Sequence, residues 1–339
     1  MRAAVLQKPN VLVIQEVEMP AIGEYDALCE SLYGGTCVGT DGHLIHNTFP
    51  FPVDYPAVLG HETIGRVIKT GEKVRNFKVG DLVTRVSTPP PKALGLCWGG
   101  FAEFAVAKDH KAMQEDGLDS ALWDSYRVNQ VVPEGIIDPQ EAVMIITWRE
   151  TLSYIKRFGV SAGGKLLIIG SGANGFSFAA HAKNIGASVC MIGSASRKSI
   201  ADQLGVELYC DYTDPALFQR VKAFGGFDFI IDAVCKKNAL NTYLPLLNSG
   251  GTVGIYGLDD FLSVTINPLC AGSFTFYNAG YDEAETHEEV IALIRDQKLN
   301  AKIFMDPADV YDLDEIAKAY EDASSRRIGG IKSVIKIKR

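Results

Sequence analysis

Residues 165–175 read KLLIIGSGANG, a short apolar run followed by a glycine-rich turn, and the pattern of a helix continues to residue 185. In the order GxGxxG, the first glycine permits a tight turn, the second lets the backbone approach a pyrophosphate, and the third allows helix and strand to pack closely. The stretch therefore predicts a dinucleotide-binding turn; a tight turn in an α/β protein that binds another ligand is the alternative. The residues expected at the pyrophosphate are Gly170, Gly172, Ala173, Asn174 and Gly175.

The alternation of apolar runs and helical patterns continues along the chain to residue 256. The predicted strands are residues 165–169, 189–192, 207–210, 228–232 and 252–256. The predicted helices between them are residues 173–185, 198–204, 215–224 and 239–247. Buried strands that alternate with amphipathic helices form a parallel sheet covered on both faces, so an α/β, doubly wound domain is expected here.

The two ends of the chain have a different sequence pattern. The first 110 residues contain short strand-like runs bounded by Gly and Pro, at residues 2–6, 11–17, 27–32, 63–70 and 82–86. The last 40 residues predict a strand at 302–305, a helix at 312–324 and a terminal strand at 331–337. The predicted layout is a β-rich domain of residues 1–150 and 300–339, interrupted by the α/β domain of residues 151–299.

The end of the second α/β strand indicates which dinucleotide binds. An acid there bonds the ribose 2′-hydroxyl of NAD, whereas basic residues accommodate the 2′-phosphate of NADP. Here Gly193 stands in the place of the acid, and the polar residues that follow are Ser194, Ser196, Arg197 and Lys198. Serine hydroxyls can donate hydrogen bonds and two cations can neutralise a dianion, so the sequence predicts NADP(H). An ordinary basic surface loop is the alternative.

Three stretches outside the predicted α/β domain carry unusual polar residues: GTCVGTDGH at 35–43, GHE at 60–62 and WRE at 148–150. Together they supply one thiolate, one imidazole and two carboxylates, from Cys37, His61, Glu62 and Glu150. Three protein ligands and an open position suit a catalytic zinc ion, which would polarise an alcohol or carbonyl oxygen. Taken singly, each stretch has a plainer interpretation as a buried thiol, a loop histidine or a helix carboxylate.

These motifs and the order of the domains resemble the zinc-dependent medium-chain dehydrogenase/reductase superfamily, near its sorbitol, threonine and glucose dehydrogenase branches. Further stretches that carry the resemblance are residues 80–83, 99–104, 227–233, 250–254 and 329–332. The resemblance covers nearly the whole chain. It implies a GroES-like catalytic domain, a Rossmann domain and one catalytic zinc per subunit in the cleft between them.

The same resemblance assigns roles to individual residues. Cys37 and His61 match the zinc ligands of the family, and Glu62 and Glu150 match carboxylates that alternate with water around the metal. Thr40 matches the hydroxyl that passes the substrate proton toward solvent, and His43 extends that relay. The segments that resemble the nicotinamide-binding backbone contain Ile255, Tyr256, Gly257 and Asn278.

The chain departs from the family at the thiolate. Val38 stands between Cys37 and Gly39, whereas the family's cysteine is usually followed at once by glycine. Counting forward from Asp26 places Cys37 at the ligand position, and counting back from Thr40 places Val38 there. We take Cys37 as the ligand, with a one-residue bulge, because a valine would leave His61 and the glutamates without their usual thiolate partner.

Two further departures lie between residues 81 and 150. Cys97 is the only cysteine in that interval, so the four-cysteine lobe is missing and no structural zinc is expected. Residues 111–128, with Trp123 and Tyr126, look like an insertion that shapes either an interface or the mouth of the cleft.

The predicted function is hydride transfer between NADP(H) and a secondary alcohol or ketone. Two carboxylates make the metal site polar, which favours a polyol, a sugar or an amino-sugar-like cyclitol over a simple aliphatic alcohol. The alternatives are a zinc-free NADPH-dependent reductase of an activated double bond or quinone, and a non-catalytic NADPH-binding protein. Phe49, Phe51 and Trp148 either line the substrate pocket or belong to the core.

Composition limits the other classes of function. The 339 residues include 33 Lys+Arg and 41 Asp+Glu, and this acidic balance argues against nucleic acid as the partner. No run approaches the roughly 20 apolar residues that span a bilayer, and the N-terminus lacks the order of a secretory signal, so a cytoplasmic protein is expected. Residues 272–276 match a family strand that pairs across a dimer, so a homodimer or homotetramer is expected.

The seven cysteines are odd in number and never form a CxxC pair, which argues against a disulfide framework. They are Cys29, Cys37, Cys97, Cys190, Cys210, Cys235 and Cys270.

Overall fold

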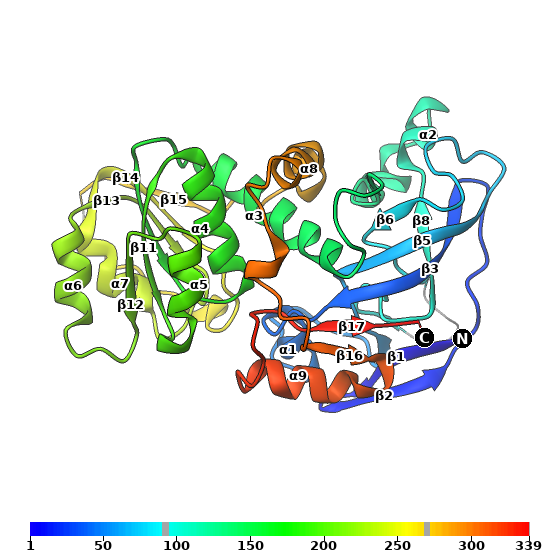
Figure 1. Cartoon of the computed structure of the whole chain (residues 1–339), viewed down its shortest axis with the longest axis horizontal. Helices are drawn as coiled ribbons and strands as arrows, with labels where there is room; N and C mark the ends of the chain where they lie inside the picture. The colour runs from blue at the N-terminus through cyan, green and yellow to red at the C-terminus, as the bar shows by residue number, and fades with distance from the viewer. Residues whose placement is uncertain (90–94, 268–271, 339) are drawn as a thin grey trace. The chain divides into compact units, whose positions relative to one another are not determined.

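The computed structural model describes residues 1–89, 95–267 and 272–338, so Cys270 lies outside the described residues. The chain forms two compact units (Figure 1): unit 1 comprises Met1–Ile146 and His287–Arg339, and unit 2 comprises Thr147–Thr286. Unit 2 is thus inserted into the sequence of unit 1. Among the described residues, no helix combines the length and the apolar character needed to cross a membrane.

Unit 2 is built on a six-stranded, parallel sheet with the strand order β12-β11-β10-β13-β14-β15. The strands are β10 (Lys165–Ile169), β11 (Ser188–Gly193), β12 (Leu208–Asp211), β13 (Phe227–Asp232), β14 (Leu247–Ile255) and β15 (Thr275–Tyr277). The chain builds outward from β10 to β12 and then returns to β13 on the other side of β10. The sheet is therefore doubly wound, and the carboxyl ends of β10 and β13 mark the point where ligands bind in such sheets.

Helices cover both faces of this sheet, with α4 and α5 on one side and α6 and α7 on the other (Figure 1). Their bounds are α4 (Ala173–Ile185), α5 (Lys198–Gln203), α6 (Leu217–Phe224) and α7 (Ala239–Tyr243). One face of the sheet packs Leu167, Cys190 and Cys210 against α6 and α7 in a single apolar cluster. Because both faces are covered, the strands read as continuous apolar runs, and the predicted α/β fold is confirmed.

The described residues of unit 1 form two sheets. The smaller has the order β2-β1-β4-β7, and the larger has the order β16-β17-β3-β5-β6-β9, with β8 also paired to β3. The strands of the smaller sheet are β1 (Arg2–Lys8), β2 (Val11–Glu16), β4 (Ala57–Val58) and β7 (Gly95–Leu96). Those of the larger sheet are β3 (Asp26–Gly35), β5 (Thr63–Thr70), β6 (Leu82–Thr84), β8 (Phe104–Lys108), β9 (Val131–Val132), β16 (Val310–Asp312) and β17 (Val334–Lys336).

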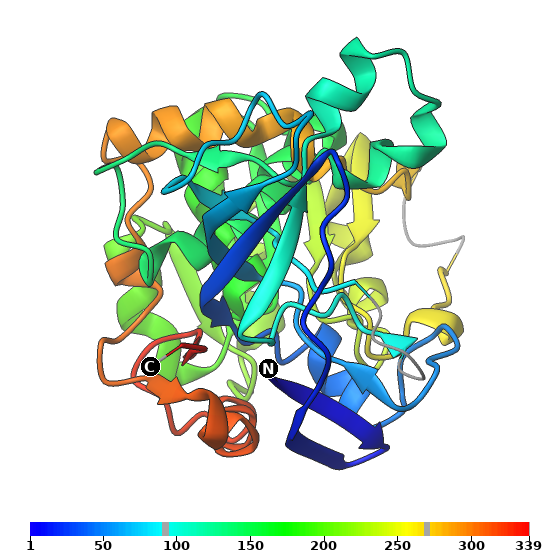
Figure 2. The ribbon, with the colours of Figure 1, turned by 90° about the vertical axis from the view of Figure 1, so that its right-hand side faces the viewer.

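Strand β3 organises the larger sheet, because β5, β8 and β17 all pair with it (Figure 2). Near its carboxyl end the register places Gly34 opposite Thr63 of β5 and Gly35 opposite Val334 of β17. The residues that follow β3, precede β5 and precede β17 are therefore brought together, although they come from three distant parts of the sequence.

The remaining helices carry the connections. They are α1 (Thr40–Ile45), α2 (His110–Glu115), α3 (Met144–Phe158), α8 (His287–Arg295) and α9 (Ile316–Ser324). Helix α8 falls in the predicted α/β interval of residues 151–299, but it clusters with unit 1. Nε2 of His287, its first residue, lies 2.9 Å from the carbonyl oxygen of Val131 in that unit.

The strand predicted at residues 302–305 is wrong. Ala301–Ile303 forms a 3-10 turn instead, and the strand of this region is β16 at Val310–Asp312. The side chain of Asn300 accepts a hydrogen bond from the backbone N–H of Lys302 at 3.0 Å, which starts a helical turn where the apolar residues alone indicated a strand.

The helix predicted at residues 312–324 begins later than expected, because Asp312 belongs to β16. A capping box between Asp312 and Glu315 starts a 3-10 turn, Leu313–Glu315, that leads into α9.

Candidate metal site and cofactor site

Three of the predicted metal ligands meet in unit 1. Cys37 follows β3, and His61 and Glu62 precede β5, so the pairing of these two strands brings them together. One potential ligand atom from each residue, namely the Cys37 sulfur, a His61 ring nitrogen and a Glu62 carboxylate oxygen, lies within 4.8 Å of the other two. A thiolate, an imidazole and a carboxylate are the donors that zinc takes in proteins, so this group fits a zinc ion. Val38, the other residue that the count of positions placed at the thiolate, is 39% exposed and is not part of this group.

The imidazole of His61 is oriented by a buried carboxylate. Nδ1 of His61 lies 3.0 Å from Oδ1 of Asp41, and the backbone N–H of Cys37 donates to Oδ2 of Asp41 at 3.2 Å. Burial disfavours the charged imidazole, but the Asp41 carboxylate and the Cys37 sulfur outweigh it, so the pKa of His61 is raised well above its usual range. With Nδ1 held by Asp41, Nε2 of His61 is the atom left for a metal.

The Glu62 carboxylate is held by a lysine from the end of the chain. The ammonium of Lys332 forms an ion pair with Oε2 of Glu62, and the side chains are 1% and 3% exposed. Oε1 of Glu62 lies 4.0 Å from Nε2 of His61, so one carboxylate oxygen faces the ligand group while the other binds the lysine. Removing either member of a buried pair leaves an uncompensated charge, so Lys332 holds the Glu62 carboxylate in position.

The described ligand group does not include the other predicted residues of the catalytic group. Thr40 is the first residue of α1, and Nδ1 of His43 in the same helix lies 2.8 Å from Oγ1 of Thr48. Glu150 is a buried residue of α3 and belongs to unit 2. The proton relay and the role of Glu150 as a ligand stay predictions.

A cavity of about 530 Å³ in unit 1 includes His61 in its wall. Its aromatic lining comes from Phe49, Trp98 and Tyr126, and the ring centroids of Trp98 and His61 are 5.1 Å apart. Of the predicted pocket residues, Phe49 therefore lines this cavity, Phe51 is 59% exposed, and Trp148 is buried in unit 2.

The segment that resembled an insertion contributes to this cavity. It overlaps α2 and contains two 3-10 turns, Ser120–Leu122 and Asp124–Tyr126. Its residues Ser125, Tyr126 and Val128 line the wall. Sequence reasoning missed Trp98. The only signal for it was a large aromatic residue placed directly before two glycines.

The glycine-rich turn of unit 2 has the shape that a pyrophosphate needs. Gly170 has a φ of +120° directly after β10, and Gly172 is the N-cap of α4. A Cβ added at Gly172 would meet nothing within 4 Å, so the backbone there is open to a ligand. At Gly175 a Cβ would collide with the Gly170 carbonyl, so helix and strand pack too closely for any side chain. These are the three roles that the motif requires.

The last residue of β11, Gly193, leaves no room for the side chain of an acid. A Cβ on Gly193 would collide with the Tyr209 hydroxyl and with the Ser171 side chain. Oγ of Ser194 lies 3.0 Å from Oγ of Ser196.

The two basic residues of the loop after β11 differ in their surroundings. Arg197 is only 9% exposed. Lys198 is exposed, and its ammonium binds the Asp202 carboxylate at 2.6 Å.

The predicted nicotinamide segments follow β14 and β15 at the carboxyl edge of the sheet. Tyr256 and Gly257 donate their backbone N–H groups to the Asp232 carbonyl at 2.8 and 3.1 Å, which ties the end of β14 to that of β13. Ile255 is the last residue of β14, and Asn278 comes directly after β15.

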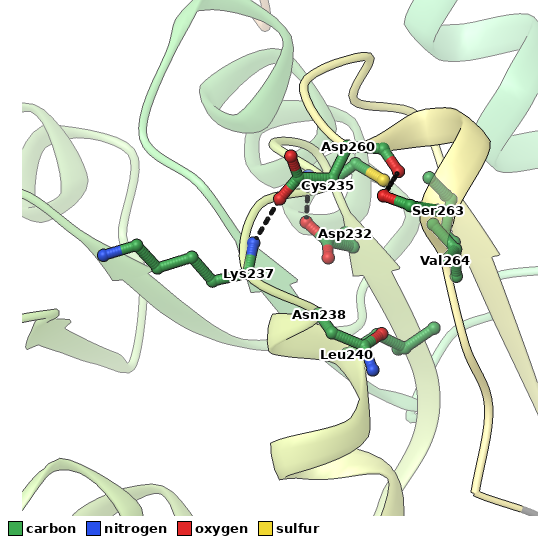
Figure 3. Close-up of a pocket in the computed structure, with 9 residues that line it drawn as sticks. Asp232, Cys235, Lys237, Asn238, Leu240, Asp260, Ser263 and Val264 are labelled. Atoms are coloured by element: carbon green, nitrogen blue, oxygen red, sulfur yellow. Dashed lines mark hydrogen bonds between the residues drawn. The ribbon is translucent and has the colours of Figure 1, made fainter.

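A hollow of about 200 Å³ opens at the same edge of unit 2, beyond the ends of β13 and β14 (Figure 3). Asp232, Cys235 and Asp260 are among its lining residues. Lys237 donates its backbone N–H to Asp260 at 2.6 Å, and its side chain extends away from the hollow in Figure 3. Of the residues predicted to bind the cofactor, Ile255 lines this hollow.

Two family models match the sequence. The Alcohol dehydrogenase GroES-like domain matches residues 23–116, and the Zinc-binding dehydrogenase family matches residues 173–296. The L-galactonate-5-dehydrogenase of Escherichia coli (strain K12) is 30% identical to this chain over 262 residues, which cover 76% of each protein. The chain belongs to the medium-chain dehydrogenase/reductase superfamily. It is therefore an oxidoreductase of the alcohol-dehydrogenase type, with a GroES-like domain and a Rossmann-like parallel sheet.

Solved structures of other dehydrogenases share the fold. A zinc-binding dehydrogenase from Sinorhizobium meliloti 1021 with bound NADP has a TM-score of 0.77 at 20% identity, over 99% of this chain and 98% of that one. An alcohol dehydrogenase from Escherichia coli CFT073 with bound NADH has a TM-score of 0.79 at 19% identity, over 99% of both chains. Because one neighbour holds NADP and the other NADH, the fold alone does not select the cofactor of this dehydrogenase.

The close packing at Gly35 yields a test of the metal group. A Cβ at this position would lie 2.6 Å from Oε2 of Glu62 and 3.1 Å from Cδ of Lys332. We expect Gly35→Ala to displace this ion pair, to lower the free energy of unfolding by about 1–3 kcal/mol, and to reduce the zinc retained through purification. Metal analysis and thermal unfolding measure both effects. Gly42→Ala is the control, since a Cβ there meets nothing within 4 Å, and equal behaviour of the two variants would contradict the prediction.

Proposed function

We propose that this oxidoreductase is a zinc-dependent alcohol dehydrogenase that prefers NADP(H) and acts on a polyol, a sugar or an amino-sugar-like alcohol. The observation that carries the proposal is the clustered group of the half-buried Cys37 and the buried His61 and Glu62, with His61 in the wall of a cavity large enough for a small substrate. A family model for zinc-binding dehydrogenases matches the chain and supports the metal. We include Glu150 as a further carboxylate ligand on the resemblance of its motif.

The protein's own contribution to the reaction is to position the reactants. When bound, zinc polarises the substrate oxygen, and NADP supplies the hydride chemistry at its nicotinamide. Asp41 holds the imidazole of His61 by its Nδ1 atom, and Lys332 holds the carboxylate of Glu62. The Thr40 hydroxyl receives the proton that the substrate loses, and His43 carries it toward solvent.

The loop after β11 supports the preference for NADP(H). The space at Gly193 excludes the acid that would bond a ribose 2′-hydroxyl, and the Ser194 and Ser196 hydroxyls lie together beside it. Arg197 supplies a positive charge, and guanidinium groups bind phosphate oxygens through paired hydrogen bonds. Lys198 contributes less, because its ammonium already binds Asp202.

The cavity of unit 1 supports a polar substrate. Arg85 and Ser87 lie in its wall together with the aromatic ring of Trp98. An aromatic face suits the C–H surface of a sugar, and N–H and O–H groups suit its hydroxyls. The relative that acts on L-galactonate, a sugar acid, favours the same class of substrate.

The edge of the six-stranded sheet supports a homo-oligomer. β15 is the last strand of that sheet, so its outer edge has no strand beside it within the described part of the chain. An open edge is a ready site for pairing with another strand. The proposed homodimer or homotetramer uses this edge.

Zinc dependence and substrate class can be tested together. We expect NADP⁺ to be reduced with members of a panel of polyols, sugars and amino alcohols, as followed by NADPH absorbance. We expect a chelator to abolish this activity and added zinc to restore it. Stoichiometric metal analysis should find one zinc per subunit, and Cys37→Ser and Glu150→Ala should both lower it. Full activity after removal of all metal would overturn the zinc assignment and favour the zinc-free reductase.

The cofactor preference has its own test. A hydrogen bond to a charged group contributes about 1.5–3 kcal/mol, so we expect Arg197→Ala to lower kcat/KM for NADP⁺ by roughly 10- to 100-fold. The same change should leave kcat/KM for NAD⁺ within a few-fold of its starting value. Lys198→Ala serves as the matched control and should cause a smaller loss. Equal use of NAD⁺ and NADP⁺ by the unaltered enzyme, or equal losses for both cofactors, would contradict this assignment.

A further inference from the structure

Beneath the metal group, a tyrosine from the C-terminal part of the chain reaches a buried carboxylate. The hydroxyl of Tyr320 in α9 donates a hydrogen bond to Oδ2 of Asp41 in α1. Asp41 is fully buried and Tyr320 is 7% exposed, so solvent does not compete for this bond. Burial and the charge of Asp41 raise the pKa of Tyr320 well above its usual range, so the hydroxyl stays protonated and able to donate.

The Asp41 carboxylate joins this tyrosine to two of the three clustered ligands. Its Oδ1 faces Nδ1 of His61 at 3.0 Å, and its Oδ2 accepts from the backbone N–H of Cys37 at 3.2 Å as well as from Tyr320. The terminal torsion of an aspartate is soft, so a carboxylate keeps one orientation only when both oxygens are held. The Tyr320 hydroxyl and the Cys37 N–H hold Oδ2, and this leaves Oδ1 directed at His61.

Packing holds the tyrosine itself in place. Tyr320 belongs to an apolar cluster with Leu44 of α1, with Leu313 of the 3-10 turn before α9, and with Ile316 and Ala319 of α9. Packing of the ring therefore restricts the position of the hydroxyl. Little further side-chain entropy is lost when the hydroxyl bonds to Asp41.

We propose that Tyr320 is a positioning residue of the metal site, which raises its affinity for zinc by orienting Asp41 and, through it, the imidazole of His61. This inference rests on the proposed zinc-dependent function. Groups that hydrogen-bond to metal ligands from behind fix the ring orientation and commonly change metal affinity by about 10- to 100-fold. Tyr320 is one hydrogen bond further from the metal ligand than Asp41, and it acts through the Asp41 carboxylate, which contacts His61.

Tyr311 provides a matched comparison within the same apolar cluster. Its hydroxyl donates to Oδ2 of Asp322 at 3.0 Å, so it also bonds a carboxylate. Asp322 lies in α9 and is not among the residues of the metal group. The substitutions Tyr320→Phe and Tyr311→Phe each remove one hydroxyl from one cluster, but only the first removes a support of His61.

The test is a zinc titration of the full-length protein against a chromophoric chelator. We expect Tyr320→Phe to raise the zinc dissociation constant by about 10-fold or more, and Tyr311→Phe to change it by less than about 3-fold. With Co²⁺ in place of zinc, Tyr320→Phe should alter the visible bands that report ligand geometry, and Tyr311→Phe should not. A loss of packing alone would lower the unfolding temperature of both metal-free variants without these selective changes.

A double-mutant cycle tests the route through the carboxylate. If Tyr320 acts through Asp41, Tyr320→Phe should weaken zinc binding much less in a protein that already carries Asp41→Asn. Unchanged zinc affinity and Co²⁺ spectrum in Tyr320→Phe, or fully additive effects in the cycle, would overturn the inference. The comparison of Tyr320→Phe with Tyr311→Phe decides the proposal even if Asp41→Asn does not fold.

The same titration separates this inference from the proposed function. If the unaltered protein binds neither zinc nor Co²⁺, the zinc-dependent function fails and the inference fails with it. If the unaltered protein binds zinc tightly and Tyr320→Phe binds it equally well, only the inference fails.

Discussion

The pairing of β3 with β5 and β17 is the constraint on which the proposed metal site depends. It sets Gly34 opposite Thr63 and Gly35 opposite Val334, so the segments beyond these residues meet at one end of the sheet. Side chains of a strand alternate between the two faces, so a slip of one residue in either pairing would turn the neighbouring side chains to the wrong face. The absence of a side chain at Gly35 completes the arrangement, because a Cβ there would crowd Oε2 of Glu62 at 2.6 Å.

A site of this kind buries ionisable groups, which costs desolvation free energy. The surrounding chain offsets this cost by pairing the buried groups with one another. Asp41, His61, Glu62 and Lys332 are all buried, and the structure joins them in two pairs, His61 with Asp41 and Glu62 with Lys332. Within each pair, the attraction between the two groups compensates their desolvation. A single member buried without its partner would destabilise the fold. This pairing also orients the ligands, so electrostatic compensation and the positioning of metal donors come from the same contacts.

Sequence reasoning found the features that are local in the chain and missed those that are not. The strand at 165–169 and the helix at 173–185 were predicted to the residue, because apolar periodicity and the glycine motif are contained within 21 residues. The group of Cys37, His61 and Glu62 could be predicted because GTCVGTDGH and GHE are short motifs. Their supports could not be found in this way: Tyr320 lies 279 residues from Asp41 and Lys332 lies 270 residues from Glu62, and only the folded sheet brings them together.

Because unit 2 is inserted into the sequence of unit 1, the contacts of Tyr320 and Lys332 link metal binding to the stability of the fold. Cys37, His61 and Glu62 precede unit 2 in the sequence, whereas Tyr320 and Lys332 follow it, so the full set of contacts exists only when both parts of unit 1 have come together. A ligand that binds only the folded state stabilises that state by mass action, and a metal draws on ligands that the unfolded chain does not hold in place. A zinc ion bound by this group would therefore stabilise the association of the N-terminal and C-terminal parts of unit 1, even though every clustered donor atom comes from the N-terminal part.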